Sequence, residues 1–174
     1  MKLSKIFLVL TLALAIVSCK NDDDGVVQFS LTNANLAGMH DLTFFELNAD
    51  GTADVGGIPV PVNLTAVGDT FQVVFDFNEN GTYTAQGQYR VVTTISVAGV
   101  SETDEEIFVL DETGTYNTNA NNQTLTISGD GNLGEGVFNV TLFNETELRM
   151  TQDISREIQG ATVDGIVELR FVRQ

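Results

Sequence analysis

Few residues in this chain have side chains suited to catalysis or metal binding. The 174 residues include one cysteine, Cys19, and one histidine, His40, and no tryptophan. A zinc site at His40 would need carboxylates alone as its other ligands, and no motif places a serine or threonine nucleophile beside it. We therefore expect His40 to be a hydrogen-bonded structural residue, and the protein to be neither an enzyme nor a metalloprotein.

One acidic motif has a spacing known from calcium sites. Asp76-x-Asn78-x-Asn80-Gly81 matches the opening of an EF-hand loop, but the twelfth position, which should be a bidentate glutamate, is Gly87. The flanking residues read as strands, whereas an EF-hand has helices on both sides. A hairpin turn is therefore the expected structure.

Other carboxylates lie close together in the second half of the chain. Asp104-Glu105-Glu106 and Asp111-Glu112 contain the residue type used in two-carboxylate glycoside hydrolysis. Such enzymes usually add an aromatic sugar platform, and this chain has only three tyrosines. We do not expect a hydrolase.

The chain begins with the layout of a secretory signal. Two lysines lie within Met1–Lys5, and Ile6–Val17 is apolar except for Thr11. As a helix these 12 residues would be ~18 Å long, well short of the ~30 Å hydrocarbon core of a bilayer. The segment is therefore expected to be a signal helix and not a membrane span.

The residues that follow resemble the lipobox of bacterial lipoproteins. Ile16-Val17-Ser18-Cys19 offers an aliphatic residue, a small pair and a cysteine, with Val17 the least typical member. The resemblance implies cleavage before Cys19, which then carries diacylglycerol on its sulfur and a further acyl chain, such as palmitate, on its amine. One acyl chain alone gives only marginal membrane attachment. We expect residues 1–18 to be a signal peptide and the lipid on Cys19 to be a stable membrane anchor.

A short charged segment, Lys20–Asp24, comes next. A lysine followed by acidic residues here resembles the surface-export signal of lipoproteins from Bacteroidetes-type bacteria, with Asn21 as a departure. The resemblance implies the outer membrane and its cell-surface side; the periplasmic face of that membrane is the alternative. The same residues suit a solvated tether. We expect residues 19–35 to comprise the lipidated cysteine and a flexible acidic tether.

Composition restricts what the rest of the chain can bind. Removing residues 1–18 leaves 156 residues, enough for one domain. It also removes Lys2 and Lys5 but no acidic residue, which changes the formal charge from −16 to −18. Such a domain is repelled by nucleic acid and by anionic head groups, so nucleic-acid binding is excluded. No second cysteine is present, and no disulfide is expected.

The clearest strand pattern is Phe71–Phe77, in which aromatic or apolar residues alternate with others. Asn78–Gly81 predicts a turn, and alternation resumes from Tyr83 to Val91, which together predict a hairpin. The aromatic face of this hairpin has two interpretations: it lines a pocket for an apolar ligand, or it fills the core. Its members are Phe71, Phe75, Phe77, Tyr83 and Tyr89.

Other segments also read as strands separated by turns. Pro59 and Pro61 predict an edge strand or a loop, because each removes a backbone donor, and Ser101–Asp104 reads as a polar, acidic turn. Turn signals recur about every 8–12 residues. We therefore predict an all-β domain over residues 36–174, a single antiparallel β-barrel, with a β-sandwich as the alternative.

Several short motifs resemble the lipocalin-like domain lipoproteins of Bacteroidetes. Phe75–Tyr83 ends a strand in a polar turn with Gly-Thr-Tyr, and a second Gly114-Thr115-Tyr116 precedes Leu125-Thr126-Ile127. The similarity covers roughly Leu36 to Val172. Lipocalins often place Gly-x-Trp on the first strand, whereas Gly38-Met39-His40 lies at the comparable place here.

The resemblance implies a barrel, and the residues themselves offer no catalytic constellation, so neither catalytic residues nor a cofactor are expected. The first function hypothesis is a binding module for a small apolar molecule or lipid, anchored through Cys19. The alternative is a structural or interaction lipoprotein whose barrel is filled. The ligand and the protein partners are not specified by any motif.

Overall fold

The structure, a computed structural model, describes residues 28–129, 135–158 and 161–174. The described residues form one four-residue helix, α2 (Asn33–Leu36), and eight strands. The strands are β1 (Gly38–Val55), β2 (Ile58–Phe77), β3 (Thr82–Val97), β4 (Val100–Asn119), β5 (Thr124–Gly129), β6 (Gly136–Phe143), β7 (Glu147–Ile158) and β8 (Ala161–Arg173). The expected signal peptide, Cys19 and the start of the tether lie outside the described residues. In the described ranges, no helix combines the length and the hydropathy that crossing a membrane requires.

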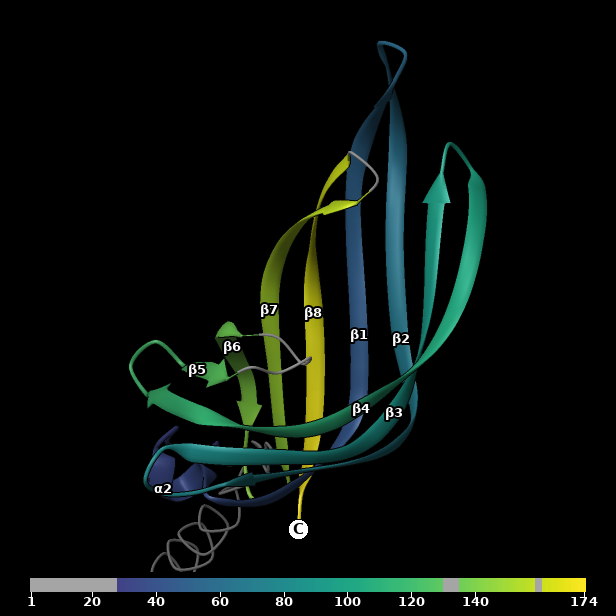
Figure 1. The fold of residues 1–174 in the computed structure, drawn as a ribbon. Helices are drawn as coiled ribbons and strands as arrows, with labels where there is room; N and C mark the ends of the chain where they lie inside the picture. Colours follow the sequence, from purple (N-terminus) through teal and green to yellow (C-terminus); the bar gives the residue numbers. More distant parts are fainter. Residues whose placement is uncertain (1–27, 130–134, 159–160) are drawn as a thin grey trace, which may run out of the picture.

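The eight strands make one antiparallel sheet that closes in a ring (Figure 1). Each strand pairs with its neighbours in the chain, and β1 pairs with β8 to complete the circle, with Leu47 opposite Val167. The prediction of an all-β, antiparallel, barrel-like domain is confirmed. The alternative of a two-sheet sandwich is wrong, because all eight strands belong to a single sheet.

β5 and β6 are much shorter than the strands on either side of them. They have 6 and 8 residues, whereas β4 has 20 and β7 has 12. β5 pairs only with residues 114–119 of β4, and β6 pairs only with residues 148–151 of β7. Within the described ranges, residues 100–111 and 152–158 therefore have a paired strand on one side only. The ring is complete at the end that holds α2 and open along one side towards the hairpin tips (Figure 1).

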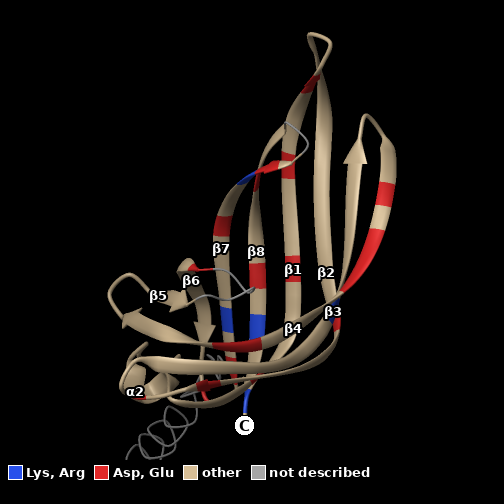
Figure 2. Ribbon diagram, in the orientation of Figure 1, with Lys and Arg blue, Asp and Glu red and all other residues tan. Residues whose placement is uncertain are grey.

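The turn between β3 and β4 lies earlier than the sequence predicts. Ala98 and Gly99 make this turn, both with positive φ (53° and 83°), and Ser101–Asp104 belong to β4. In sequence the acidic run resembles a solvated turn. In the fold the acidic run is part of a strand that is paired on one side only, and charged side chains are common on such edge strands. Figure 2 shows this concentration of acidic residues along the rising part of β4.

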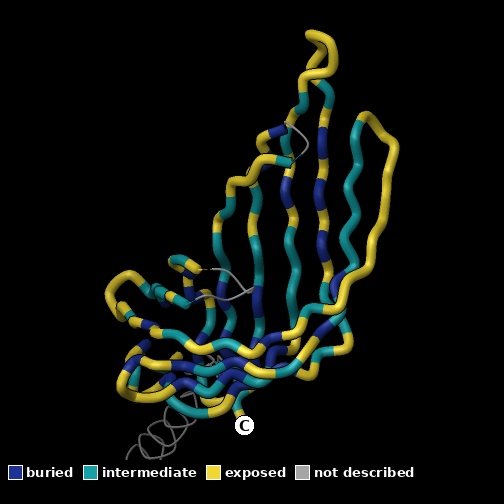
Figure 3. Tube along the Cα trace, in the orientation of Figure 1, coloured by how far each residue is buried: buried dark blue, intermediate teal, exposed yellow. Residues whose placement is uncertain are grey.

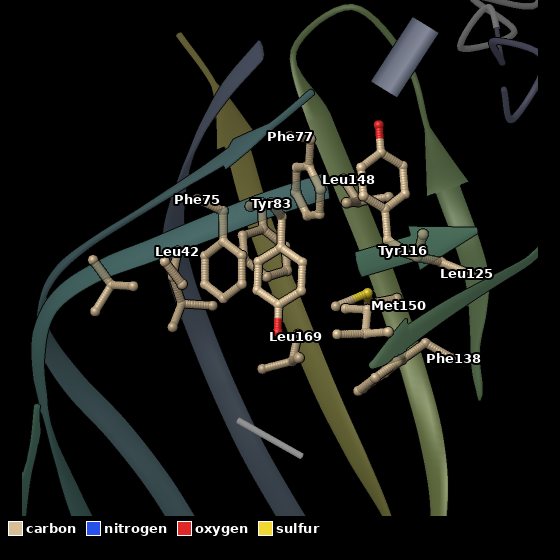
Figure 4. Packing of buried hydrophobic residues seen from close by; sticks show 14 of the residues in the cluster. Leu42, Phe75, Phe77, Tyr83, Tyr116, Leu125, Phe138, Leu148, Met150 and Leu169 are labelled. Carbon is tan, nitrogen blue, oxygen red and sulfur yellow. The ribbon is translucent and has the colours of Figure 1, made fainter. Parts of the chain in front are cut away.

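The packed core fills the closed end of the ring, where buried residues are concentrated (Figure 3). Aromatic rings pack against one another there: Phe75 and Tyr83 are stacked with ring centres 6.0 Å apart, and Tyr116 meets Phe77 edge-on at 5.1 Å (Figure 4). Aromatic pairs of this kind contribute about 0.5–1.5 kcal/mol beyond the area that they bury. These aromatic side chains therefore serve as core packing at this end of the interior.

The segment before β1 packs against the closed end of the ring. Leu31 and Leu36 are fully buried in the core, and Phe29 meets Phe143 edge-on with ring centres 5.8 Å apart. The predicted flexible tether is therefore too long at its C-terminal end, because residues from Phe29 onward are held by the core. Phe29 and Leu31 are the apolar side chains that hold this part of the segment.

Hydrogen bonds secure α2 in this position. The Asn35 N–H donates to the Thr32 hydroxyl (3.2 Å), an N-cap interaction. The Arg173 guanidinium, near the end of β8, donates to the carbonyls of Asn35 (2.9 Å) and Ala37 (2.8 Å). The two ends of the described chain are thus joined at the closed end.

Candidate ligand-binding groove

Beyond the packed core, the inner face of the sheet lines an open groove of about 440 Å³. Strands β1, β2, β3, β4, β7 and β8 all contribute side chains to it. The lining residues are Phe45, Leu47, Leu64, Ala66, Tyr89, Val91, Thr93, Ile95, Phe108, Gln152, Ile154, Arg156, Glu157, Ile158 and Val167. A smaller hollow of about 140 Å³ shares Ile95 and Ile158 with the groove and continues towards the tips of the hairpins.

The groove is apolar because successive strands place apolar residues on the same face. Ala66 on β2 is opposite Leu47 on β1 and Thr93 on β3, and side chains alternate between the two faces along each strand. Small residues allow neighbouring strands to approach one another closely. At Gly165 an added Cβ would lie 2.5 Å from the Cα of Ala49, so only glycine permits this close approach of β8 to β1.

Charged side chains lie along the rims. Glu102, Asp104 and Glu106 of β4 are opposite Ile95, Thr93 and Val91 in the β3–β4 register, which places the three carboxylates on the inner face. These three residues are exposed. On the other side of the opening, β7 supplies Arg156 and Glu157. The groove therefore combines an apolar floor with polar, predominantly acidic rims.

An ion-pair network on the outer face joins the strands that support the acidic rim. The guanidinium of Arg90 on β3 donates two hydrogen bonds to Asp69 on β2 (2.6 and 2.9 Å) and one to Glu105 on β4 (3.0 Å). Arg90 holds the pKa of the Asp69 carboxyl below its usual value. Because the groups are substantially exposed, each ion pair adds little stability. Their geometry nevertheless fixes β2, β3 and β4 relative to one another.

The five residues predicted as pocket lining lie in different parts of the interior. Phe75, Phe77 and Tyr83 are at most 3% exposed and belong to the packed core. The interpretation of these three as core residues is therefore the one that the structure supports. Phe71 is partly buried, packs against the core and does not line the groove.

Tyr89 lies where the packed core meets the groove and is the one predicted residue that lines the groove. Its ring stacks between those of Phe71 and Phe108, with centres 5.8 and 5.7 Å away. Burial, aided by the charge of Glu112, raises the pKa of the Tyr89 phenol to about 12. Tyr89 is therefore neutral at physiological pH, which keeps the floor uncharged.

The EF-hand-like motif forms the predicted hairpin turn. The Gly81 N–H donates to the Asn78 carbonyl (3.0 Å), and the Asn80 side chain accepts from the Thr82 N–H (3.0 Å). In the described ranges, no group of three or more histidine, cysteine or acidic side chains is arranged to hold a metal ion.

His40 is buried at the closed end, far from any rim. Its Nδ1–H donates to the Gly38 carbonyl (3.0 Å), because a carbonyl can only accept, and its ring meets Phe77 edge-on at 5.4 Å. The prediction of a hydrogen-bonded histidine is confirmed. Among the described residues, Nε2 has no hydrogen-bond partner. Burial lowers the pKa of the imidazole below its ordinary value, and this effect outweighs the opposing charges of Asp41 and Asp76.

The fold and the groove define a small β-domain with one packed end and one open, apolar end. Comparison with protein-family models, curated proteins and solved structures finds no match to the chain.

We expect His40 to make folding sensitive to mild acid. Its pKa is lowered in the folded state, so the unfolded chain takes up the proton first, and stability is lost as pH falls from about 6.5 towards the folded pKa. The loss is at most about 1.4 kcal/mol per pH unit. Urea unfolding at pH 7.5 and pH 5.5 should show a smaller drop in His40→Gln than in the wild type. Equal drops in both proteins would contradict this role.

Proposed function

We propose that this protein is a non-enzymatic lipoprotein whose barrel-like domain, lipocalin-like in architecture, binds a small apolar molecule or a lipid in the groove. The observation that carries the proposal is the unfilled groove itself. Its volume of about 440 Å³ is within the range of ~300–1,000 Å³ that is typical of ligand pockets. Eight-stranded barrels can either fill their interior or hold one small ligand, and here the two arrangements occupy opposite ends.

The chemistry of the lining supports an apolar ligand with a polar end. Leu47, Ile95 and Val167 would exchange water contacts for contacts with the ligand, a gain of about 25 cal/mol per Å² of apolar surface. The neutral Tyr89 closes the floor. Polar parts of the ligand would lie at the rim, beside the carboxylates of β4 and the guanidinium of Arg156.

The proposed anchor fits the position of the groove. Eight residues lie between Cys19 and Gln28, the first described residue, and the chain from Cys19 to Gln28 reaches at most ~31 Å when extended. Figure 1 shows α2 and the C-terminus at the closed end and the hairpin tips at the other. A lipid on Cys19 would therefore hold the closed end near the outer membrane and leave the groove facing away from it. The cell surface is the proposed side, with the periplasmic face as the alternative.

Filling the groove should remove the ligand. Thr93 lines the groove, whereas Thr94 is the next residue on β3 and faces outward, where its hydroxyl meets that of Thr103 (3.1 Å). We expect the wild type and Thr94→Phe, purified from the native host, to carry a co-purifying lipid or other apolar molecule in native mass spectrometry. Thr93→Phe should carry at least about tenfold less, which corresponds to ~1.4 kcal/mol.

The matched pair separates loss of ligand from loss of fold, because both variants add one phenyl group to the same strand. If the wild type is free of ligand, or if both variants retain it equally, the groove is not the binding site. The alternative, a structural or interaction lipoprotein, would then be favoured by the filled core at the closed end.

The anchor has its own test. Metabolic labelling with an alkyne fatty acid should mark the wild-type protein, and Cys19→Ser should abolish the label and release the protein from the membrane fraction. His40→Gln serves as a control that leaves the cysteine intact and should be labelled as the wild type is. Labelling that survives Cys19→Ser would show that the lipobox interpretation is wrong.

A further inference from the structure

The free edge of β4 is a second surface with the features of a binding site. Residues 100–111 pair with β3 on one side, and no described residue pairs with them on the other. A one-sided strand of this length presents a row of backbone N–H and C=O groups that can template another strand. Strand pairing at this edge would not require the groove ligand, because the pairing groups are those of the main chain.

The side chains along this edge are strongly acidic. β4 contains six acidic residues and no lysine or arginine: Glu102, Asp104, Glu105, Glu106, Asp111 and Glu112. Three of them, Glu102, Asp104 and Glu106, lie on the inner face, at every second position. On the outer face, Ile107 and Val109 are each 62% exposed. The edge therefore presents an acidic inner row and an apolar outer pair. Figure 2 shows the acidic residues along β4.

We propose that this edge binds an extended, cationic segment of a partner protein by β-strand addition. In such a pair, side chains directly opposite one another are about 5 Å apart. Lysine or arginine at every second position of the segment would face Glu102, Asp104 and Glu106. Apolar residues at the positions between them would lie beside Ile107 and Val109.

Charge selects this partner over the other candidates. A second copy of the chain would bring its own acidic β4 to the edge, and like charges directly opposite one another destabilise strand pairing. The chain's own tether is also acidic at Asp22–Asp24. A cationic strand would form main-chain hydrogen bonds with β4 and would also be attracted by its carboxylates. The added strand would extend the wall of the groove along its open side.

Two capped nine-residue peptides test the proposal on the full-length chain in nonionic micelles: lysine alternating with valine, and glutamate alternating with valine. Calorimetry should show binding of the lysine peptide alone, weakened by salt. Amide hydrogen exchange should slow within residues 100–111 when that peptide binds. A lysine peptide with N-methylated backbone amides on its pairing edge keeps the charge but cannot complete the ladder, so it should not bind.

A charge-reversed edge should reverse the preference. Asp104→Lys with Glu106→Lys should weaken binding of the lysine peptide by at least about tenfold and create binding of the glutamate peptide, since each change turns an attraction between opposite residues of the strand pair into a repulsion. Asp50→Lys with Asp164→Lys is the matched control. These two aspartates are opposite one another on paired strands away from the edge, and the control should keep the wild-type preference.

Three results would overturn the proposal: equal binding of the N-methylated peptide, protection confined to segments other than β4, or dimerisation of the free chain through β4 in place of peptide binding. The two proposals are tested independently. Absence of peptide binding would not affect the groove proposal, because lipid co-purification needs no peptide, and absence of a groove ligand would not affect strand addition at β4.

Discussion

The shape of the domain depends on where the hydrogen-bonded ladder between β4 and β5 ends. Its last pair is Gly114 opposite Gly129, and the ring of Tyr83 lies directly over that pair: a Cβ on Gly114 would be 2.6 Å from the ring. Because Gly114 and Gly129 have no side chain, the ring of Tyr83 can pack over them at the closed end. Beyond this pair, no described residue pairs with residues 100–111 of β4 on that side. Within this stretch the inner-face residues Glu102, Asp104 and Glu106 are exposed, so the interior beside them is open to solvent.

The point at which the β4–β5 ladder ends explains why the two ends of the domain differ. Where all eight strands are present, inward-facing aromatic and leucine side chains meet across a short distance and form a dry core. Where β5 and β6 are missing, β1–β4, β7 and β8 curve round an apolar space that is open on one side. The acidic character of β4 suits this position, because charges at a free edge discourage pairing between identical chains.

The sequence predicted much of the fold but little of the groove. Alternation identified the hairpin around Asn78–Gly81, because the face of a strand can be read from its period of two. The prolines were also informative: β2 pairs with β3 only from Val62 onward, so Pro59 and Pro61 lie where β2 has a strand on one side only. Alternation does not reveal what covers a face, however. Tyr83 and Tyr89 follow the same pattern, yet only Tyr89 reaches the groove, since the extent of β5 and β6 is decided by tertiary pairing.

The ring is closed at one end only, and amide hydrogen exchange in the free, full-length protein distinguishes this arrangement from a barrel that is paired along its whole length. Residues 114–119 pair with β5, Gly114 and Thr115 pair also with β3, and the Tyr116 N–H donates to the Gly81 carbonyl (2.7 Å). We predict slow exchange at Gly114, Thr115 and Tyr116. In residues 100–111, antiparallel geometry directs alternate N–H groups to the edge that no described strand pairs with, and we predict that fast and slow amides alternate there. Uniform slow exchange along the whole of β4 would contradict the account, because it would mean that the strand is paired on both sides to its tip.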